Sequence, residues 1–344
     1  MALLIVAVAV HVAVGAWLLH RRVRLSHLLA AFAILCAALL AGWWRLPLFP
    51  RLGLAAVYAF GEVPFFLLVA AARVRAERPW LARAAAGAAA IILAVALQGF
   101  VIEPRWLEVT TFTLTSPRVA KRTRLVLLAD FQTDEVGAYE LATLRTIADL
   151  APDVLVLSGD YLQIHGPSRA AQAAAFRESF ERLGLVIERM RIVAVGGDVD
   201  PSGWESELFA PGVVATSETK EAEIDGVVFT LLSLSDSANP RLAVPHHQAF
   251  HVVVGHRPDY ALGTGGGDLL LAGHTHGGQV QVPFIGPLVT LSGVPRAWAG
   301  GGLHAAGGRS LIVSRGSGLE RAVGAPRIRL LCRPQIVVVD LAPG

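Results

Sequence analysis

Four apolar segments fill the first hundred residues and restrict this part of the chain to membrane-spanning helices. They cover residues 2–19, 28–44, 54–72 and 82–101. Each is close to the ~20 apolar residues that an α-helix needs to cross ~30 Å of hydrocarbon. The first segment could instead be a signal peptide, but no small-residue cleavage site precedes Arg21 and three further segments follow. We therefore predict four transmembrane helices within residues 1–102.

Arginines beside the apolar segments predict their orientation. Three arginines follow the first segment and three follow the third, whereas the loop after the second has two. Because basic loops stay in the cytoplasm, this pattern places both termini and everything after residue 101 outside it. The net charge of +3 and the pI of about 9.2 then reflect membrane topology rather than nucleic-acid binding. We predict an integral protein of the cytoplasmic membrane with an extracytoplasmic second domain and no nucleic-acid partner.

From residue 103 the composition is that of a globular domain, in which strands and helices first alternate. Strands are predicted at 109–114 (an edge), 124–129, 153–158 and 191–195, and helices at 139–150 and 168–183. A β-rich part follows, with a hairpin at 223–234 and strands at 251–255, 268–272, 279–282, 309–314 and 335–341. Residues 263–267 and 299–308 are interpreted as glycine-rich loops. This order favours two sheets packed face to face with helices outside.

The predicted fold therefore has two parts. Residues 1–102 form an all-α transmembrane anchor. Residues 103–344 form an α/β domain, a four-layer αββα sandwich of two mixed sheets flanked by helices.

The sequence LLLAGHTHGGQ at 269–279 indicates a binding site at the end of a strand. An apolar run that enters a glycine-rich turn places the next side chains at the carboxyl end of a buried strand, where α/β sheets build their sites. His274 and His276 are two residues apart, so in extended backbone both rings would point the same way. Two neutral imidazoles that converge on one point are a metal-binding arrangement. A glycine turn that happens to carry two histidines is the alternative.

Further polar side chains follow the other predicted strands. They are Asp130 with Gln132, Asp160, Asp198 with Asp200, and His256. Each alone has an ordinary explanation as a turn or cap residue, but together they gather where a doubly wound sheet keeps its crevice. The chain has only two cysteines, which disfavours a thiolate site. The predicted site is therefore built from oxygen and nitrogen ligands.

The order of these residues resembles the calcineurin-like metallophosphoesterase superfamily, and most of all its membrane-attached bacterial branch, whose last motif reads GHTHGGQ. The matching motifs are Asp130-x-Gln132, Gly159-Asp160, Gly196-Gly197-Asp198, Gly255-His256-x-Pro258 and Gly273-His274-Thr275-His276-Gly277-Gly278-Gln279. The similarity extends over roughly 125–336. It implies that Asp130, Asp160 and His276 bind one divalent ion. It also implies that Asp160 bridges to a second ion, which His256 and His274 bind.

Two motifs depart from the family pattern. Gln132 stands where the first motif has a histidine. The third motif, G-N-H-D, is matched with residues 196–199, so Gly197 replaces the ligand Asn and Asp198 replaces the His that protonates the leaving group. Because nearby cations keep a carboxylate ionised, we expect Asp198 to bind metal rather than donate a proton, with Asp200 in reserve. Gln132 can offer its carbonyl oxygen, and this shift towards oxygen ligands favours Mn²⁺ or Mg²⁺ over Zn²⁺ or iron.

These inferences lead to one main hypothesis and one alternative. The main hypothesis is a membrane-anchored hydrolase, a phosphoesterase, in which two metal ions activate a hydroxide for in-line attack at phosphorus. Asp160, Asp198 and His256 are its predicted catalytic residues. The predicted substrate is a phosphodiester or phosphomonoester of an envelope lipid or lipid-linked sugar. The alternative is a non-catalytic binding or scaffold domain whose metal site was lost with the altered motifs.

Overall fold

The structure of the chain, a computed structural model, describes residues 43–164, 168–182 and 190–344. It divides into two compact units, Met1–Val101 with Glu320–Arg327, and Ile102–Leu319 with Ile328–Gly344. The predicted spans at 2–19 and 28–44 lie outside the described residues, except for the last two residues of the second. Residues 320–327 group with the first unit, although the sequence had placed them in the second domain. The roles of anchor and catalytic domain stay predictions.

The first unit contains two long apolar helical stretches. Leu48–Val74 joins α3 (Leu48–Val57), the π-helical turn η1 (Tyr58–Glu62) and α4 (Val63–Val74), and Pro79–Arg105 begins with α5 (Pro79–Leu97) and η2 (Gln98–Ile102). Pro64 is the second residue of α4, in its first turn, where the missing proline N–H is tolerated. Both stretches, which contain the predicted spans 54–72 and 82–101, are long and apolar enough to cross a membrane.

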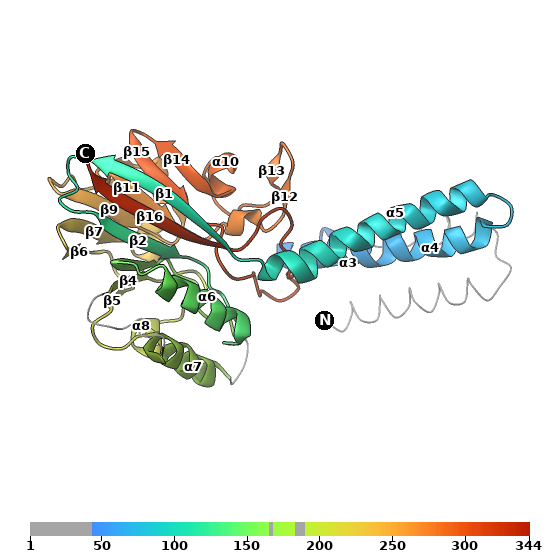
Figure 1. Cartoon of the computed structure of the whole chain (residues 1–344), viewed down its shortest axis with the longest axis horizontal. Helices are drawn as coiled ribbons and strands as arrows, with labels where there is room; N and C mark the ends of the chain where they lie inside the picture. The colour runs from blue at the N-terminus through green and yellow to red at the C-terminus, as the bar shows by residue number, and fades with distance from the viewer. Residues whose placement is uncertain (1–42, 165–167, 183–189) are drawn as a thin grey trace. The chain divides into compact units, whose positions relative to one another are not determined.

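Two six-stranded sheets form the second unit (Figure 1). The first has the order β1 (Glu108–Ser116), β16 (Gln335–Pro343), β2 (Thr123–Leu128), β3 (Val154–Leu157), β4 (Arg191–Val195) and β5 (Val214–Thr216). The second has the order β14 (Gly302–Ala306), β15 (Arg309–Val313), β11 (Leu269–Ala272), β9 (Phe250–Val254), β7 (Val227–Leu231) and β6 (Lys220–Ile224). β2 to β5 are parallel, as are β7, β9, β11 and β15, and β1 is parallel to β16. β16 is antiparallel to β2, β14 to β15 and β6 to β7. Both sheets are therefore mixed.

Alternate side chains of the two sheets pack against each other to form the central core. Leu125 and Leu127 of β2 belong to the same buried cluster as Val252 and Leu271 of the second sheet. The other face of the first sheet is covered by α6 (Ala138–Asp149) and α7 (Arg169–Arg182), whose apolar side chains join a second cluster. Short helices, η4 (Pro258–Leu262) and α10 (Arg296–Ala299), contribute to the cover of the second sheet. The predicted αββα sandwich of two mixed sheets flanked by helices is confirmed, with a thin fourth layer.

Several local predictions differ from the structure. The supposed loop 299–308 contains the whole of strand β14, which pairs antiparallel with β15 through a tight turn at Gly307 and Gly308, both at positive φ. Such a turn needs glycines, so a glycine-rich composition here marks a hairpin and not a loop. The predicted strand 279–282 is reduced to the two residues of β12 (Gln281–Val282), which pair with β13 (Gly286–Pro287).

Candidate metal centre

Six of the predicted site residues converge at the carboxyl ends of five strands. They follow β2, β3 and β4 in the first sheet and β9 and β11 in the second. Among the described residues they form two groups, Asp130 with Asp160 and His276, and Asp198 with His256 and His274. Within each group the potential ligand atoms all lie within 4.8 Å of one another. Parallel strands that end at the same edge of a sheet bring these distant segments together.

Asp160 and His256 connect the two groups. His256 Nε2 lies 3.5 Å from Asp160 Oδ2 and 3.3 Å from Asp198 Oδ2. Asp160 therefore lies between the group that contains Asp130 and the group that contains His274, the position that the resemblance implies for a bridging carboxylate. The two sets of side chains form one continuous site.

The two histidines of the last motif serve different groups. His274 Nδ1 lies 2.8 Å from Asp198 Oδ2, whereas His276 Nε2 lies 3.9 Å from Asp130 Oδ1. The expectation that both rings point the same way was wrong, because the backbone is not extended here. Both histidines have left-handed backbone, with φ of 69° and 48°, and a short 3₁₀ turn, η5 (His276–Gly278), begins at the second. Each ring is thereby directed to a separate group.

Left-handed backbone is concentrated at this site. Four non-glycine residues other than the histidines have positive φ here: Asp130 (47°), Gln132 (37°), Asp160 (57°) and Gln279 (58°). Such conformations cost free energy in non-glycine residues and persist where the surrounding structure enforces them, often at functional sites. The chain therefore maintains strained backbone where it positions these polar side chains.

Hydrogen bonds to backbone carbonyls fix the orientation of two imidazoles. His256 Nδ1 lies 2.8 Å from the Ser158 carbonyl oxygen, and His274 Nε2 lies 3.0 Å from the Leu291 carbonyl oxygen. In a neutral imidazole the nitrogen that contacts a carbonyl carries the proton. The other nitrogen, which lies beside the carboxylates of Asp160 and Asp198, is then available to bind a metal ion. Metal-binding histidines are commonly held in this way.

Buried negative charge makes this a suitable site for cations. Asp130 and His256 are both 0% exposed and Asp160 is 4% exposed. Burial raises the pKa of Asp130 to about 7 and also raises the pKa of Asp160. Burial opposes the charge on His256, but its carboxylate neighbours, Asp160 first, raise its pKa to about 10. Since these groups require a positive charge between them, the donor set fits divalent cations.

Asp198 behaves differently from the other acids. Burial opposes its ionisation, but hydrogen bonds from His256, His274 and Arg257 outweigh this and hold its pKa well below the usual range. Asp198 is consequently an anion at neutral pH, as expected for a metal ligand and not for a proton donor. The structure supports that sequence-based expectation, although the ligand role itself stays a prediction.

The third motif fits the structure better in a register shifted by one residue. A Cβ added to Gly197 would lie 2.3 Å from Asp160 Oδ1, so this position does not accommodate the side chain of a ligand Asn. Asp198 instead lies with His256 and His274, where that Asn would act. Matching G-N-H-D to residues 197–200 places Asp198 at the Asn, Val199 at the leaving-group His and Asp200 at the final Asp.

Gln132 is held by the neighbouring motif. It is buried, its Nε2 donates to Gln163 Oε1 at 3.0 Å, and its backbone N–H donates to the Asp160 carbonyl at 2.8 Å. These bonds orient the amide next to the group of Asp130, Asp160 and His276. Metal binding through its carbonyl oxygen stays a prediction.

The sequence left two further charged residues without a firm role. Arg257 donates to Asp198 through both Nε and an Nη nitrogen, with Nε 3.2 Å from each carboxylate oxygen. Asp200, considered only a reserve ligand, accepts the backbone N–H groups of Asp160, Gly197 and Tyr161 at 2.8–3.0 Å. In the sequence, the only indication of a role for Arg257 was its place directly after His256. For Asp200 it was the G-N-H-D motif matched to residues 197–200, in which Asp200 is the final Asp.

We expect Asp200→Asn to destabilise the protein, because an amide nitrogen cannot accept the backbone N–H groups that the carboxylate now binds. The loss of a hydrogen bond to a charged group costs about 2 kcal/mol, which corresponds to a fall in Tm of roughly 4–8 °C in a domain of this size. The measurement is a thermal melt of the purified full chain. Asp225→Asn, in the exposed β6–β7 turn, is the matched control and should leave Tm unchanged. Equal melting of the two variants would contradict the assigned role.

Comparison with known proteins agrees with the motif resemblance. No family model matches the chain. It is 26% identical over 270 residues to the uncharacterized metallophosphoesterase YkuE of Bacillus subtilis (strain 168), covering 70% of the chain and 87% of the relative. It is 34% identical over 107 residues to the phosphodiesterase YaeI of Escherichia coli (strain K12), covering 31% of the chain and only 34% of the relative. Both relatives support the calcineurin-like metallophosphoesterase superfamily for this chain.

Proposed function

We propose that the chain is a membrane-anchored, metal-dependent phosphoesterase whose centre holds two divalent ions. The observation that carries the proposal is the pair of side-chain groups at the strand ends, connected through His256 and Asp160. The two relatives, one a metallophosphoesterase and one a phosphodiesterase by name, support it independently. Asp130, Asp160 and His276 would hold one ion, with Gln132 beside them. Asp198, His256 and His274 would hold the other, with Asp160 shared.

The protein side chains have separate roles at this centre. Two bound ions would supply a hydroxide nucleophile and stabilise the charge that develops on phosphorus and on the leaving oxygen. Asp160 would be shared by both ions, because it belongs to the group with Asp130 and His276 and its carboxylate also contacts His256. Asp200 fixes the backbone of Asp160 by accepting its N–H. Asp198 stays ionised and keeps the Arg257 guanidinium beside the site, so that a fixed positive charge is available to an anionic substrate. Val199 stands where the family has a proton-donating His, so leaving-group stabilisation falls to the metal and not to an acid.

The substrate and location follow from the anchor. Two described helices are long and apolar enough to span a membrane, and the arginine pattern supports an extracytoplasmic active domain in the cytoplasmic membrane. A centre tethered beside a bilayer meets phosphodiesters or phosphomonoesters of envelope lipids or lipid-linked sugars. The oxygen-rich donor set supports Mn²⁺ or Mg²⁺ over Zn²⁺ or iron.

Metal content of the purified full chain tests the proposal. We expect about two divalent ions per chain after loading with Mn²⁺ and desalting, together with hydrolysis of a nitrophenyl phosphodiester. The replaced residues of the first and third motifs, Gln132 and Asp198, favour the alternative of a non-catalytic scaffold domain. One ion or none, without hydrolysis, would establish that alternative and refute the two-metal enzyme.

A further inference from the structure

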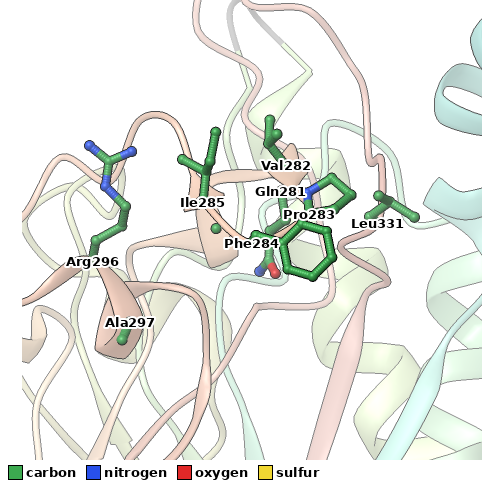
Figure 2. A pocket seen from close by; sticks show the side chains of 9 residues that line it. Gln281, Val282, Pro283, Phe284, Ile285, Arg296, Ala297 and Leu331 are labelled. Atoms are coloured by element: carbon green, nitrogen blue, oxygen red, sulfur yellow. The ribbon is translucent and has the colours of Figure 1, made fainter.

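The hairpin formed by β12 and β13 exposes large apolar side chains at its tip. Phe284 is fully exposed, and Ile285 in the same turn is 57% exposed. Leu331, from a different part of the chain, is also 57% exposed and lines the same hollow of about 410 Å³ (Figure 2). Exposed apolar side chains that gather in one place mark contact sites, whereas isolated ones are common on any surface.

The backbone of the tip is unfavourable in water. Phe284 has φ of 68°, the left-handed region, which turns usually assign to glycine or asparagine. A bulky aromatic residue at this position costs conformational free energy and also exposes its ring. Leu291, 47% exposed and close behind the hairpin in sequence, has φ of 51°. Strain combined with exposed apolar surface indicates a segment shaped for an apolar environment outside the domain.

Within the second unit, the hairpin lies close to the place where the last apolar helical stretch ends. The Gln281 N–H donates to the Leu330 carbonyl at 3.0 Å, next to Leu331. The following residue, Cys332, donates its N–H to the carboxylate of Glu103, which lies within the stretch Pro79–Arg105. A chain that enters a bilayer through this stretch therefore has the apolar tip near its point of entry.

Aromatic and basic side chains accompany the apolar tip. Trp106 is 52% exposed, and the Arg333 guanidinium lies 4.3 Å from the centre of its ring. Arg296, exposed on the hollow, donates to the Pro287 carbonyl at 3.0 Å. Tryptophan and arginine beside apolar anchors are typical of membrane interfaces, where the cations attract anionic headgroups. A second copy of this chain would bring arginines against arginines, so charge favours a lipid surface.

We propose that the hairpin tip, Phe284 and Ile285 with Leu331, inserts into the interfacial region of the bilayer that anchors the chain. The segment that follows the hairpin reaches the metal centre, because the Leu291 carbonyl accepts the His274 Nε2 proton. Docking therefore holds the mouth of the centre at headgroup depth. The inference rests on the proposed membrane anchor and on the exposed surface and chain connectivity of the hairpin, and it holds whether or not the centre binds two ions.

Site-specific fluorescence in lipid nanodiscs tests the docking. The full chain carrying Phe284→Cys in a Cys36→Ser background is labelled with an environment-sensitive dye. It is placed, one chain per disc, in anionic phospholipid that contains a fraction of spin-labelled lipid. Cys332 is fully buried, and the Cys36→Ser parent measures any labelling there. Glu223→Cys, on edge strand β6 of the second sheet, is the matched control, and Ile285→Cys is a second probe if Phe284→Cys folds poorly.

We expect blue-shifted emission and several-fold stronger quenching by the spin-labelled lipid at positions 284 and 285 than at position 223. Equal, weak quenching at all three positions would overturn the proposal. Energy transfer between dyes when two chains share a disc, without lipid quenching, would assign the surface to a second copy and also overturn it. Lipid quenching that persists in metal-free protein would separate docking from the proposed hydrolysis.

Discussion

Asp160→Asn is expected to abolish phosphodiester hydrolysis and to lower the metal content of the chain. Asp160 belongs to the group with Asp130 and His276. Its carboxylate also lies 3.5 Å from His256 of the other group. Asparagine keeps the shape but removes the negative charge that two cations would share. When residues act as a unit at a catalytic centre, the loss of one lowers kcat on the order of 10⁴-fold. The measurements are turnover of a nitrophenyl phosphodiester and bound Mn²⁺ per chain.

The control for this variant must keep the fold and change a distant acid. Asp225→Asn meets this requirement, because Asp225 lies in the β6–β7 turn and pairs with Lys121 at the surface. Asparagine tolerates the positive φ of this position. It should keep parental turnover and metal content. If Asp160→Asn retained turnover with two ions bound, Asp160 would not bridge and the two-metal mechanism would be wrong.

The sandwich was predictable because each buried strand is a short apolar run ended by a polar or glycine residue. β2, β3, β4, β9 and β11 all lie within one or two residues of their predicted limits, and each is followed by a residue of the centre. Local pattern sets these strands, because a parallel strand buried on both faces must be almost continuously apolar. The same pattern predicted which side chains would meet, since parallel strands share one carboxyl edge.

Geometry beyond the strand ends was not predictable from a local pattern. The third motif could begin at Gly196 or at Gly197, and two adjacent glycines in the sequence do not distinguish these registers. The close contact of Gly197 with Asp160, which follows another strand, decides between them. The direction of the His274 and His276 rings depends on left-handed backbone enforced by tertiary contacts. The apolar hairpin tip was missed for a related reason, since exposure of Phe284 is a property of the folded surface.

Gly197→Asn, which would restore the family residue in the register first inferred from the sequence, is expected instead to inactivate the protein. A Cβ there would lie 2.3 Å from Asp160 Oδ1 and 2.5 Å from Asp160 N, so the new side chain would displace Asp160, the proposed bridging acid. We expect a fall in kcat/KM on the order of 10²-fold or more, similar to that from disturbing residues that orient metal ligands. Gly197→Ala adds the Cβ without the amide and should reproduce most of the loss.

Asp198→Asn provides the opposite test, because the shifted register makes it the substitution that restores the family ligand. The carbonyl oxygen of asparagine can still face His256 and His274 from the position of Oδ2, which Arg257 Nε also contacts at 3.2 Å. The bond from the Arg257 Nη nitrogen to Oδ1 is lost. Turnover should therefore stay within about tenfold of the parent, since the proposed ligand atom is retained and only its charge is lost. Both variants are compared by kcat/KM at saturating Mn²⁺ and by bound metal per chain. An active Gly197→Asn beside an inactive Asp198→Asn would reverse the assignment, because the ligand position would then belong to residue 197.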